Sequence, residues 1–215
     1  MKNFIRNSVS TILTTIFLSI NSVTPAQENY TFDEVEINQN QVIAMAIPLS
    51  NLNEDEVPRY KLIVLEQRSN ERLCWSESES ESQLYPILVE PLLLDFNFTG
   101  ICGRATDSNG YSIRIDDYDL SIDYRLTLQN INGEIKLWGT SLKGDRILIG
   151  GTGGISDGAM KIFLEPGWKF TKRSYRGKVL GHFYFSYDSF GAQKDTLEEK
   201  IGDIQHQMVT QPCRL

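Results

Sequence analysis

The chain has 215 residues, with 28 Asp and Glu against 21 Lys and Arg, so its formal net charge is −7 at pH 7. An acidic chain lacks the attraction to phosphate that drives nucleic-acid binding, and we therefore exclude nucleic acid as the expected partner. The length is sufficient for one domain with a substantial hydrophobic core.

Residues 1–26 have the three parts of a cleavable signal peptide. Lys2 and Arg6 form a positive region, the apolar run 9–20 follows, and small residues precede Ala26. The apolar run of about 12 residues is shorter than the roughly 20 that a membrane-spanning helix needs. We expect cleavage after Ala26, a secreted or periplasmic location, and no membrane span in the mature protein.

Residues 27–190 are predicted to form one all-β domain. Short runs of strand-like composition follow one another, separated by turns and without a long amphipathic helix between them. These runs cover 42–47, 60–65, 111–115, 124–131, 134–138, 146–149, 160–164 and 179–185. Their spacing favours a sandwich or barrel of short antiparallel strands over a βαβ architecture.

Two of these runs carry a more specific signal. The run 60–65 is apolar apart from Lys61, which indicates a strand covered on both faces. Asn132 and Gly133 separate two alternating segments, and both residue types tolerate the positive φ that a two-residue type I′ turn requires. We therefore expect a tight β-hairpin over 124–138.

Three segments are expected to lie outside this pattern of strands. The acidic, low-complexity stretch Ser76–Ser82 is predicted to be a solvated loop, and the glycine-rich stretch 149–158 a flexible connection. Residues 191–215 are predicted to contain a short C-terminal helix, because apolar residues recur there at helical spacing. They are Leu197, Ile201, Ile204 and Met208.

Three cysteines remain after the leader: Cys74, Cys102 and Cys213. An oxidising compartment favours a disulfide, and the odd number leaves one thiol over. Cys74 and Cys102 lie inside the patterned domain, whereas Cys213 lies near the end of the tail. We expect a Cys74–Cys102 bridge, which would contribute on the order of 3 kcal/mol for a loop of about 28 residues. The sequence does not fix this pairing.

Several phrases in the middle of the chain resemble one protein family. They are Cys74-Trp75 and the segments 90–104, 107–114, 161–168 and 177–184. Together they resemble the cyanobacterial domain-of-unknown-function family numbered 3747, over roughly residues 32–187. The resemblance implies a cyanobacterial source, export and no assigned activity, and it supplies no catalytic residues.

Cys102 and His182 are one candidate pair for catalysis. A cysteine nucleophile needs an imidazole that holds it as thiolate, and secreted cell-wall peptidases and transpeptidases use such pairs. Glycines also flank Cys102, as they flank some nucleophiles. No helical pattern follows it, however, and Cys74 is an obvious disulfide partner. The favoured interpretation is therefore a structural disulfide and a strand histidine.

Carboxylates are dense at Asp107, Asp116, Asp117, Asp119 and Asp123. Such a group suits calcium, which takes roughly six to eight oxygen ligands, and Asp116, Asp117 and Asp119 are the candidates for a metal site. The EF-hand loop pattern does not fit, because an alanine stands where the first ligand belongs. The favoured interpretation is a solvated turn without metal, and no cofactor is expected.

One segment is basic and aromatic in an otherwise acidic chain. Aromatic rings stack on sugars, while Lys and Arg pair with carboxylate or sulfate groups, so an anionic polysaccharide suits this segment. If the segment is a strand, alternation turns part of it toward the core and leaves the cations as its outward face. The candidate ligand-binding residues are Trp168, Lys172, Arg173, Tyr175 and Arg176.

These observations favour a non-catalytic extracytoplasmic module that binds or builds part of the cell envelope or extracellular matrix. Anionic polysaccharide or other envelope components are its expected partners. The signal peptide, the β pattern, the expected disulfide and the lack of a complete catalytic signature motivate this hypothesis. The alternative is a cell-wall hydrolase or transpeptidase with Cys102 as nucleophile and His182 as base.

Overall fold

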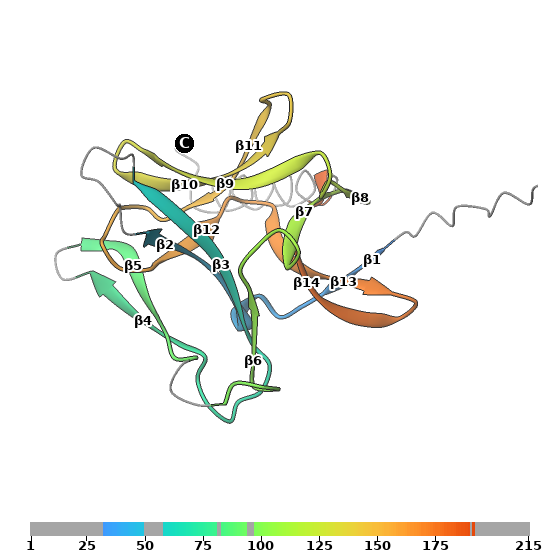
Figure 1. The fold of residues 1–215 in the computed structure, drawn as a ribbon, viewed down its shortest axis with the longest axis horizontal. Coiled ribbons are helices and arrows are strands. Elements are labelled where there is room, and N and C mark those ends of the chain that lie inside the picture. The colour runs from blue at the N-terminus through green and yellow to red at the C-terminus, as the bar shows by residue number, and fades with distance from the viewer. Residues whose placement is uncertain (1–31, 50–57, 81–82, 94–96, 190, 192–215) are drawn as a thin grey trace, which may run out of the picture. The chain divides into compact units, whose positions relative to one another are not determined.

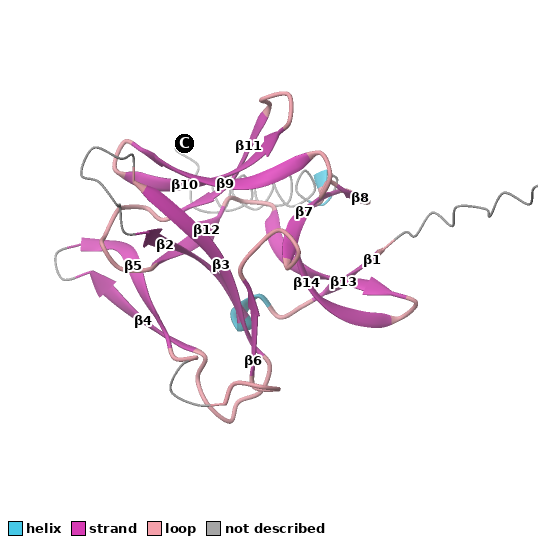
Figure 2. Ribbon diagram, in the orientation of Figure 1, coloured by secondary structure: helices cyan, strands magenta, loops and turns pink. Residues whose placement is uncertain are grey.

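The structure is a computed structural model that describes residues 32–49, 58–80, 83–93, 97–189 and 191. These residues are almost entirely strands and turns (Figure 2), which confirms the predicted all-β class. The signal peptide predicted over 1–26 and the helix predicted in the C-terminal tail lie outside the described residues. Across the described ranges, we find no helix that is long and apolar enough to cross a membrane.

One sheet has five strands in the order β1-β13-β14-β7-β8 (Figure 1). β13 and β14 form a long antiparallel hairpin, and β7 runs parallel to β14. Strands from the beginning, middle and end of the domain therefore meet in this sheet. Its strands are β1 (Asp33–Glu36), β7 (Tyr111–Ile115), β8 (Tyr118–Asp119), β13 (Trp168–Tyr175) and β14 (Lys178–Tyr187).

The second sheet has nine strands, with the main order β6-β3-β2-β12-β11-β10-β9. β5 joins it by pairing with β12, and β4 pairs with β5. A short 3₁₀ helix, η1 (Gln39–Gln41), leads into β2. The strands are β2 (Val42–Leu49), β3 (Arg59–Gln67), β4 (Trp75–Ser80), β5 (Gln83–Pro91), β6 (Cys102–Ala105), β9 (Tyr124–Ile131), β10 (Glu134–Ser141), β11 (Arg146–Gly151) and β12 (Met160–Leu164).

Strands β2 and β3 separate two hydrophobic cores. Successive side chains of a strand point to opposite faces, so Ala44 of β2 enters the larger core between the two sheets and Met45 enters a smaller core. In β3, Val64 likewise enters the larger core and Leu65 the smaller one. All four side chains have 0% exposure. The strand is thus covered on both faces over residues 62–65, as predicted, whereas Lys61 is exposed.

The predicted hairpin is formed by β9 and β10. Ile131 pairs with Glu134 across the turn, and Asn132 and Gly133 have φ angles of 54° and 79°. Positive φ at both central positions is the geometry of a type I′ turn. The local sequence signal for this hairpin is therefore confirmed.

Residues 76–80 of the acidic stretch form a strand and not a loop, so that prediction was wrong for them, and residues 81 and 82 lie outside the described residues. Most of the stretch forms β4, and pairing with β5 places Ser78 opposite Leu88. Serine and glutamate alternate with a period of two, which suits a strand. Glu77 also meets Lys161 Nζ of β12 at 2.7 Å. Composition indicated a loop here, whereas periodicity would have indicated a strand.

The glycine-rich stretch 149–158 is only partly a connection between strands, and the prediction was wrong for its first residues. Gly150 and Gly151 belong to β11 and pair with Leu164 and Phe163 of β12. A Cβ atom at Gly150 would lie 2.3 Å from the carbonyl oxygen of Phe163. The close approach of these two strands therefore requires glycine at this position.

Candidate functional site

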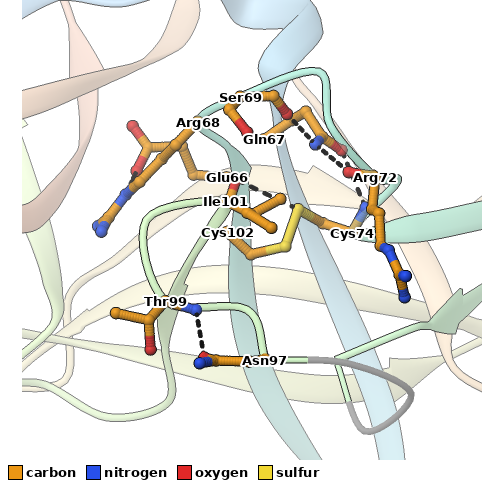
Figure 3. Close-up of a disulfide and its surroundings, with 10 residues drawn as sticks. All are labelled: Glu66, Gln67, Arg68, Ser69, Arg72, Cys74, Asn97, Thr99, Ile101 and Cys102. Atoms are coloured by element: carbon orange, nitrogen blue, oxygen red, sulfur yellow. Dashed lines mark hydrogen bonds and ion pairs between the residues drawn. A yellow bond between two sulfur atoms is a disulfide. The ribbon is translucent and has the colours of Figure 1, made fainter.

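A disulfide joins Cys74 to Cys102 (Figure 3), the pair expected from the sequence. The side chain of Gln67 positions the segment before β4, because its amide nitrogen donates to the carbonyls of Ser69 and Arg72. Its oxygen accepts from the Cys74 backbone nitrogen at 2.9 Å. Both cysteines are buried in the smaller core, at 0% and 3% exposure. The bridge therefore fixes the start of β4 to the start of β6.

The structure does not assemble the catalytic pair of the alternative hypothesis. The sulfur of Cys102 is bonded to Cys74, so it supplies no thiolate. His182 uses its ring elsewhere: Nε2 lies 2.8 Å from the Ser112 hydroxyl, and Nδ1 lies 2.8 Å from the carbonyl oxygen of Asn109. Because a carbonyl only accepts, Nδ1 carries the proton and Nε2 accepts from Ser112.

Buried polar side chains cover one face of the five-stranded sheet, and of these sequence reasoning identified only His182. On β14, His182, Tyr184 and Ser186 alternate with residues of the larger core, and β7 adds Ser112 and Arg114. All five residues are 7% exposed or less. The signal that could have found them is a period of two, polar on one face and apolar on the other, in two separate segments.

Asp119 of β8 lies at the centre of this polar network. Its Oδ2 accepts from Arg173 Nη2 at 2.6 Å and from the Tyr184 hydroxyl at 2.8 Å. Arg173 Nε donates to the same hydroxyl at 2.7 Å. Nearby, Arg114 Nε lies 2.9 Å from the carboxylate of Glu34. Each of these charged groups has an opposite charge beside it, so the charges are compensated within the protein, although the buried Arg114 Nε makes no hydrogen bond.

The surroundings shift the pKa of the titrating groups in this network. Burial lowers the pKa of His182 below its ordinary value of 6.5, so the ring is neutral at neutral pH. Burial alone would raise the pKa of Asp119, but hydrogen bonds, first that from Tyr184, and the charge of Arg173 hold it below its ordinary value. Burial and the bond to Asp119 raise the pKa of Tyr184 to about 12.

The three carboxylates considered for a metal site serve separate purposes. Asp119 belongs to the polar network, and Asp116 accepts from the backbone nitrogen and the hydroxyl of Ser189, both at 2.9 Å. The Asp117 side chain is fully exposed, 3.9 Å from Arg114 Nη2. Within the part of the chain that the structure describes, no group of His, Cys, Asp and Glu is arranged to hold a metal ion. The calcium alternative therefore has no geometric support there.

Lys172 and Arg173, two of the five basic and aromatic candidates, are neutralised inside the protein. Lys172 Nζ lies 2.6 Å from the carboxylate of Glu66 on β3, with side-chain exposures of 7% and 13%. Arg173, the next residue of β13, binds Asp119 at 2.6 Å on the opposite side of the sheet. The two cations therefore lie on opposite sides of the sheet and do not form one binding surface.

The other three candidates lie at the two ends of β13. Arg176 lies over the Tyr175 ring at 5.1 Å, and that ring meets Phe32 edge-on at 5.9 Å, next to the β13–β14 turn. Trp168 begins β13 at its other end, with its ring centroid 5.4 Å from that of Tyr187. Of the five candidates, Trp168 alone lines the groove between β2 and β12.

This groove, of about 370 Å³, opens where β2 and β12 part. The two strands are paired up to Ile162 opposite Ala44. Beyond this point β12 pairs with β11 through Phe163 and Leu164, while β2 stays paired with β3. The strands therefore leave a space between them, with Ile43 on one side and Phe163 on the other.

Helix η1 and the first residues of β13 form another part of the groove wall. The side-chain nitrogen of Gln39 donates to the Phe170 carbonyl at 2.7 Å, and its oxygen accepts from the Phe170 nitrogen at 2.8 Å. Asn38 caps the short helix by accepting from the Asn40 nitrogen at 3.0 Å. These bonds place Asn40 and Trp168 in the lining.

The groove combines aromatic rings with paired charges. Phe163 is 38% exposed, and Lys161 Nζ lies 5.6 Å from its ring centroid. Lys161 binds Glu77 at 2.7 Å, and Lys169 of β13 binds Glu36 of β1. Apolar surface with a few fixed polar groups is typical of small-ligand sites. The groove can therefore hold a ligand that offers both apolar faces and hydrogen-bonding groups.

A family model described as a protein of unknown function (DUF3747) matches residues 8–190. The chain belongs to this family. The match spans both sheets of the domain and confirms the family that the sequence phrases resemble. Neither the curated proteins nor the solved structures gave a match. Because DUF3747 carries no assigned activity, the interpretation of the groove rests on its geometry and chemistry.

Proposed function

We propose that this DUF3747 protein is a non-catalytic extracytoplasmic module of the cell envelope or extracellular matrix, and that it binds polysaccharide in the groove between β2 and β12. The groove carries the proposal, because the aromatic residues Phe163 and Trp168 line it together with charged and hydrogen-bonding residues. The signal-peptide pattern of residues 1–26 supports export. The Cys74–Cys102 disulfide suits an oxidising compartment.

Two further observations favour binding over thiol chemistry. Cys102 is engaged in the disulfide, so a hydrolase or transpeptidase has no nucleophile at this position. The Asp119 carboxylate is occupied by Arg173 and Tyr184 of the protein itself. The proposal therefore rests on the groove and not on these two regions.

Retention on polysaccharide tests the proposed function. The protein is purified from the periplasm of an expression host, so that the disulfide forms, and run in native gels that contain polysaccharide from the envelope and matrix of the native organism. Phe163→Ala should weaken retention about tenfold, which corresponds to the loss of roughly 1.4 kcal/mol of ring contact. Leu142→Ala is the matched control, because Leu142 is also apolar and is 71% exposed outside the groove.

The outcomes separate clearly. Retention of wild type and of Leu142→Ala, with weak retention of Phe163→Ala, supports the groove as the binding site. Equal retention of the two variants places the ligand elsewhere, and a wild-type protein that is not retained by any of these polysaccharides contradicts the proposed function.

Location is tested separately by N-terminal sequencing of the protein recovered from the periplasm and the medium of the native organism. The expected mature chain starts at Gln27, directly after Ala26. Recovery of a chain that still begins at Met1 in the membrane pellet would contradict cleavage and release.

A further inference from the structure

We infer that the groove between β2 and β12 takes an uncharged saccharide, held by aromatic contact and hydroxyl hydrogen bonds and not by charge attraction. This inference rests on the proposed function and names the ligand class of the same site. It differs from the anionic polysaccharide expected from the sequence. That expectation depended on Lys172 and Arg173, whose charges are taken up by Glu66 and Asp119.

Each lysine that lines the groove already has a carboxylate beside it. Lys161 binds Glu77 at 2.7 Å, and Lys169 binds Glu36. The hydrogen bond to Glu36 raises the pKa of Lys169, which keeps this lysine charged together with its partner. An anionic sugar would meet lysines whose charge is already compensated, so it would gain little net charge attraction. The net charge of −7 on the chain further opposes a polyanion.

A sugar hydroxyl, in contrast, matches such a pair. It donates to the carboxylate and accepts from the ammonium group at the same time, so the ion pair need not break. The pair is also held in orientation, because Glu77 Oε1 accepts from Trp75 Nε1 at 3.0 Å while Oε2 binds Lys161. β4 and β12 therefore present a donor and an acceptor that are ordered before a ligand arrives.

The aromatic rings of the groove are ordered in the same way. Phe163 meets the ring of Tyr85 edge-on, with centroids 5.4 Å apart and an interplanar angle of 86°. Trp168 is held against Tyr187 with centroids 5.4 Å apart. Each ring thus has an aromatic neighbour that restricts its rotamers, and little additional side-chain entropy is lost on binding.

Native affinity electrophoresis with defined polysaccharides tests the ligand class. The neutral probes are hydroxyethyl cellulose, dextran and galactomannan, and the anionic probes are alginate and pectate. We expect retardation by at least one neutral probe, with Kd changing less than about twofold between about 50 mM and about 500 mM NaCl, because screening weakens only charge attraction.

Two variants and their control test whether the polysaccharide binds in the groove. Phe163→Ala should raise Kd about tenfold, and Lys161→Met should raise it several-fold by the same factor at both salt concentrations. Lys143→Met is the control, because Lys143 is an exposed lysine outside the groove lining and should leave Kd unchanged. Thermal melting of each variant checks that it is folded.

The possible failures are distinguishable. Retardation only by alginate or pectate, with Kd rising steeply with salt, overturns the uncharged ligand and leaves polysaccharide binding intact. Neutral binding that Phe163→Ala and Lys161→Met do not weaken overturns the site. A folded wild-type protein that none of the five probes and no polysaccharide of the native organism retards overturns the proposed function itself.

Discussion

The protein contains two kinds of charge pair in different surroundings. Lys172 and Glu66 join the two sheets at 2.6 Å, with side-chain exposures of 7% and 13%. Lys161 and Glu77 meet at 2.7 Å beside the groove, with exposures of 26% and 34%. The distances are nearly equal, so what separates the two pairs is their burial.

Burial decides what each pair contributes. A desolvated pair is costly to break, because removing one partner leaves a charge in an apolar medium. A pair that keeps water around it contributes little to stability, since its attraction is screened. The same pair can exchange that water for the hydroxyls of a ligand. The comparison therefore predicts that the buried pair controls folding and the groove pair controls binding.

Breaking the buried pair is expected to have the largest effect. Glu66→Met should lower the free energy of unfolding by about 3–5 kcal/mol, because Lys172 then stays buried without a counter-ion. Arg68 also loses its contact with Glu66, but it is 41% exposed and can turn to water. Urea denaturation followed by circular dichroism measures the change.

The double variant is the control for this prediction. Combining Glu66→Met with Lys172→Met removes both charges and should restore most of the lost stability, since apolar replacements of a buried pair are often neutral. A single variant as stable as wild type, or a double variant as unstable as the single, would contradict the comparison.

Removal of the disulfide should have the next largest effect. Replacing Cys74 and Cys102 together by Ala should lower the free energy of unfolding by about 3 kcal/mol, because the unfolded chain gains the freedom of the opened loop. This crosslink involves no charge, so the loss should be independent of salt, whereas effects of the exposed pairs should shrink as salt rises. Urea denaturation at low and high salt checks both statements, and a salt-dependent loss would contradict the second.

His182 should produce a smaller effect that is confined to acid pH. Its folded pKa lies below the ordinary 6.5, so below about pH 6.5 the unfolded chain binds a proton that the folded chain does not. The free energy of unfolding should therefore fall as pH drops below 6.5. In His182→Gln this fall should be absent, because glutamine does not titrate.

Asp119 affects the free energy of unfolding in a lower pH range than His182, so the two contributions can be measured separately. Its folded pKa lies below the ordinary 3.8, so its stabilisation is present above pH 3.8 and is lost as pH falls through the folded value. Denaturation of wild type and His182→Gln between about pH 7.5 and 4.5 isolates the histidine. Parallel curves for the two proteins over this range would show that His182 is not the cause.

The groove pair should have the smallest effect on stability. Lys161→Met should change the free energy of unfolding by less than about 1 kcal/mol, because the pair is partly exposed and screened. The same variant should weaken binding of a neutral polysaccharide. A loss of stability as large as that of Glu66→Met would contradict the comparison, because the groove pair would then contribute to folding as much as the buried pair.

The elements that could be predicted from the sequence depend on neighbouring residues. Asn132 and Gly133 define a turn by their own φ preferences, and the apolar run 60–65 shows its burial directly. Residues 76–80 were misjudged because low complexity was given more weight than a period of two.

The candidate site could not be predicted, because it depends on contacts between distant segments. The groove exists because β2 and β12 stop pairing after Ala44 and Ile162, and no local signal marks the end of such a register. Lys172 was expected at the surface, yet its partner Glu66 is 106 positions away. Trp168 was identified for its ring, but the cations expected beside it, Lys172 and Arg173, pair with carboxylates inside the protein.

The strand order of the five-stranded sheet determines when a newly synthesised chain can finish folding. β1 pairs with β13, and β14 lies between β13 and β7. The first strand of the domain therefore cannot join the sheet until the last two strands, β13 and β14, are present. A chain that leaves a ribosome or a translocon from its N-terminus cannot close this sheet until Tyr187 has emerged. Chains cut short before β13 lack the partners of Glu66 and Asp119 and the aromatic residues that cover the larger core. Such fragments expose apolar surface and are expected to be removed by proteases, so only full-length domains accumulate.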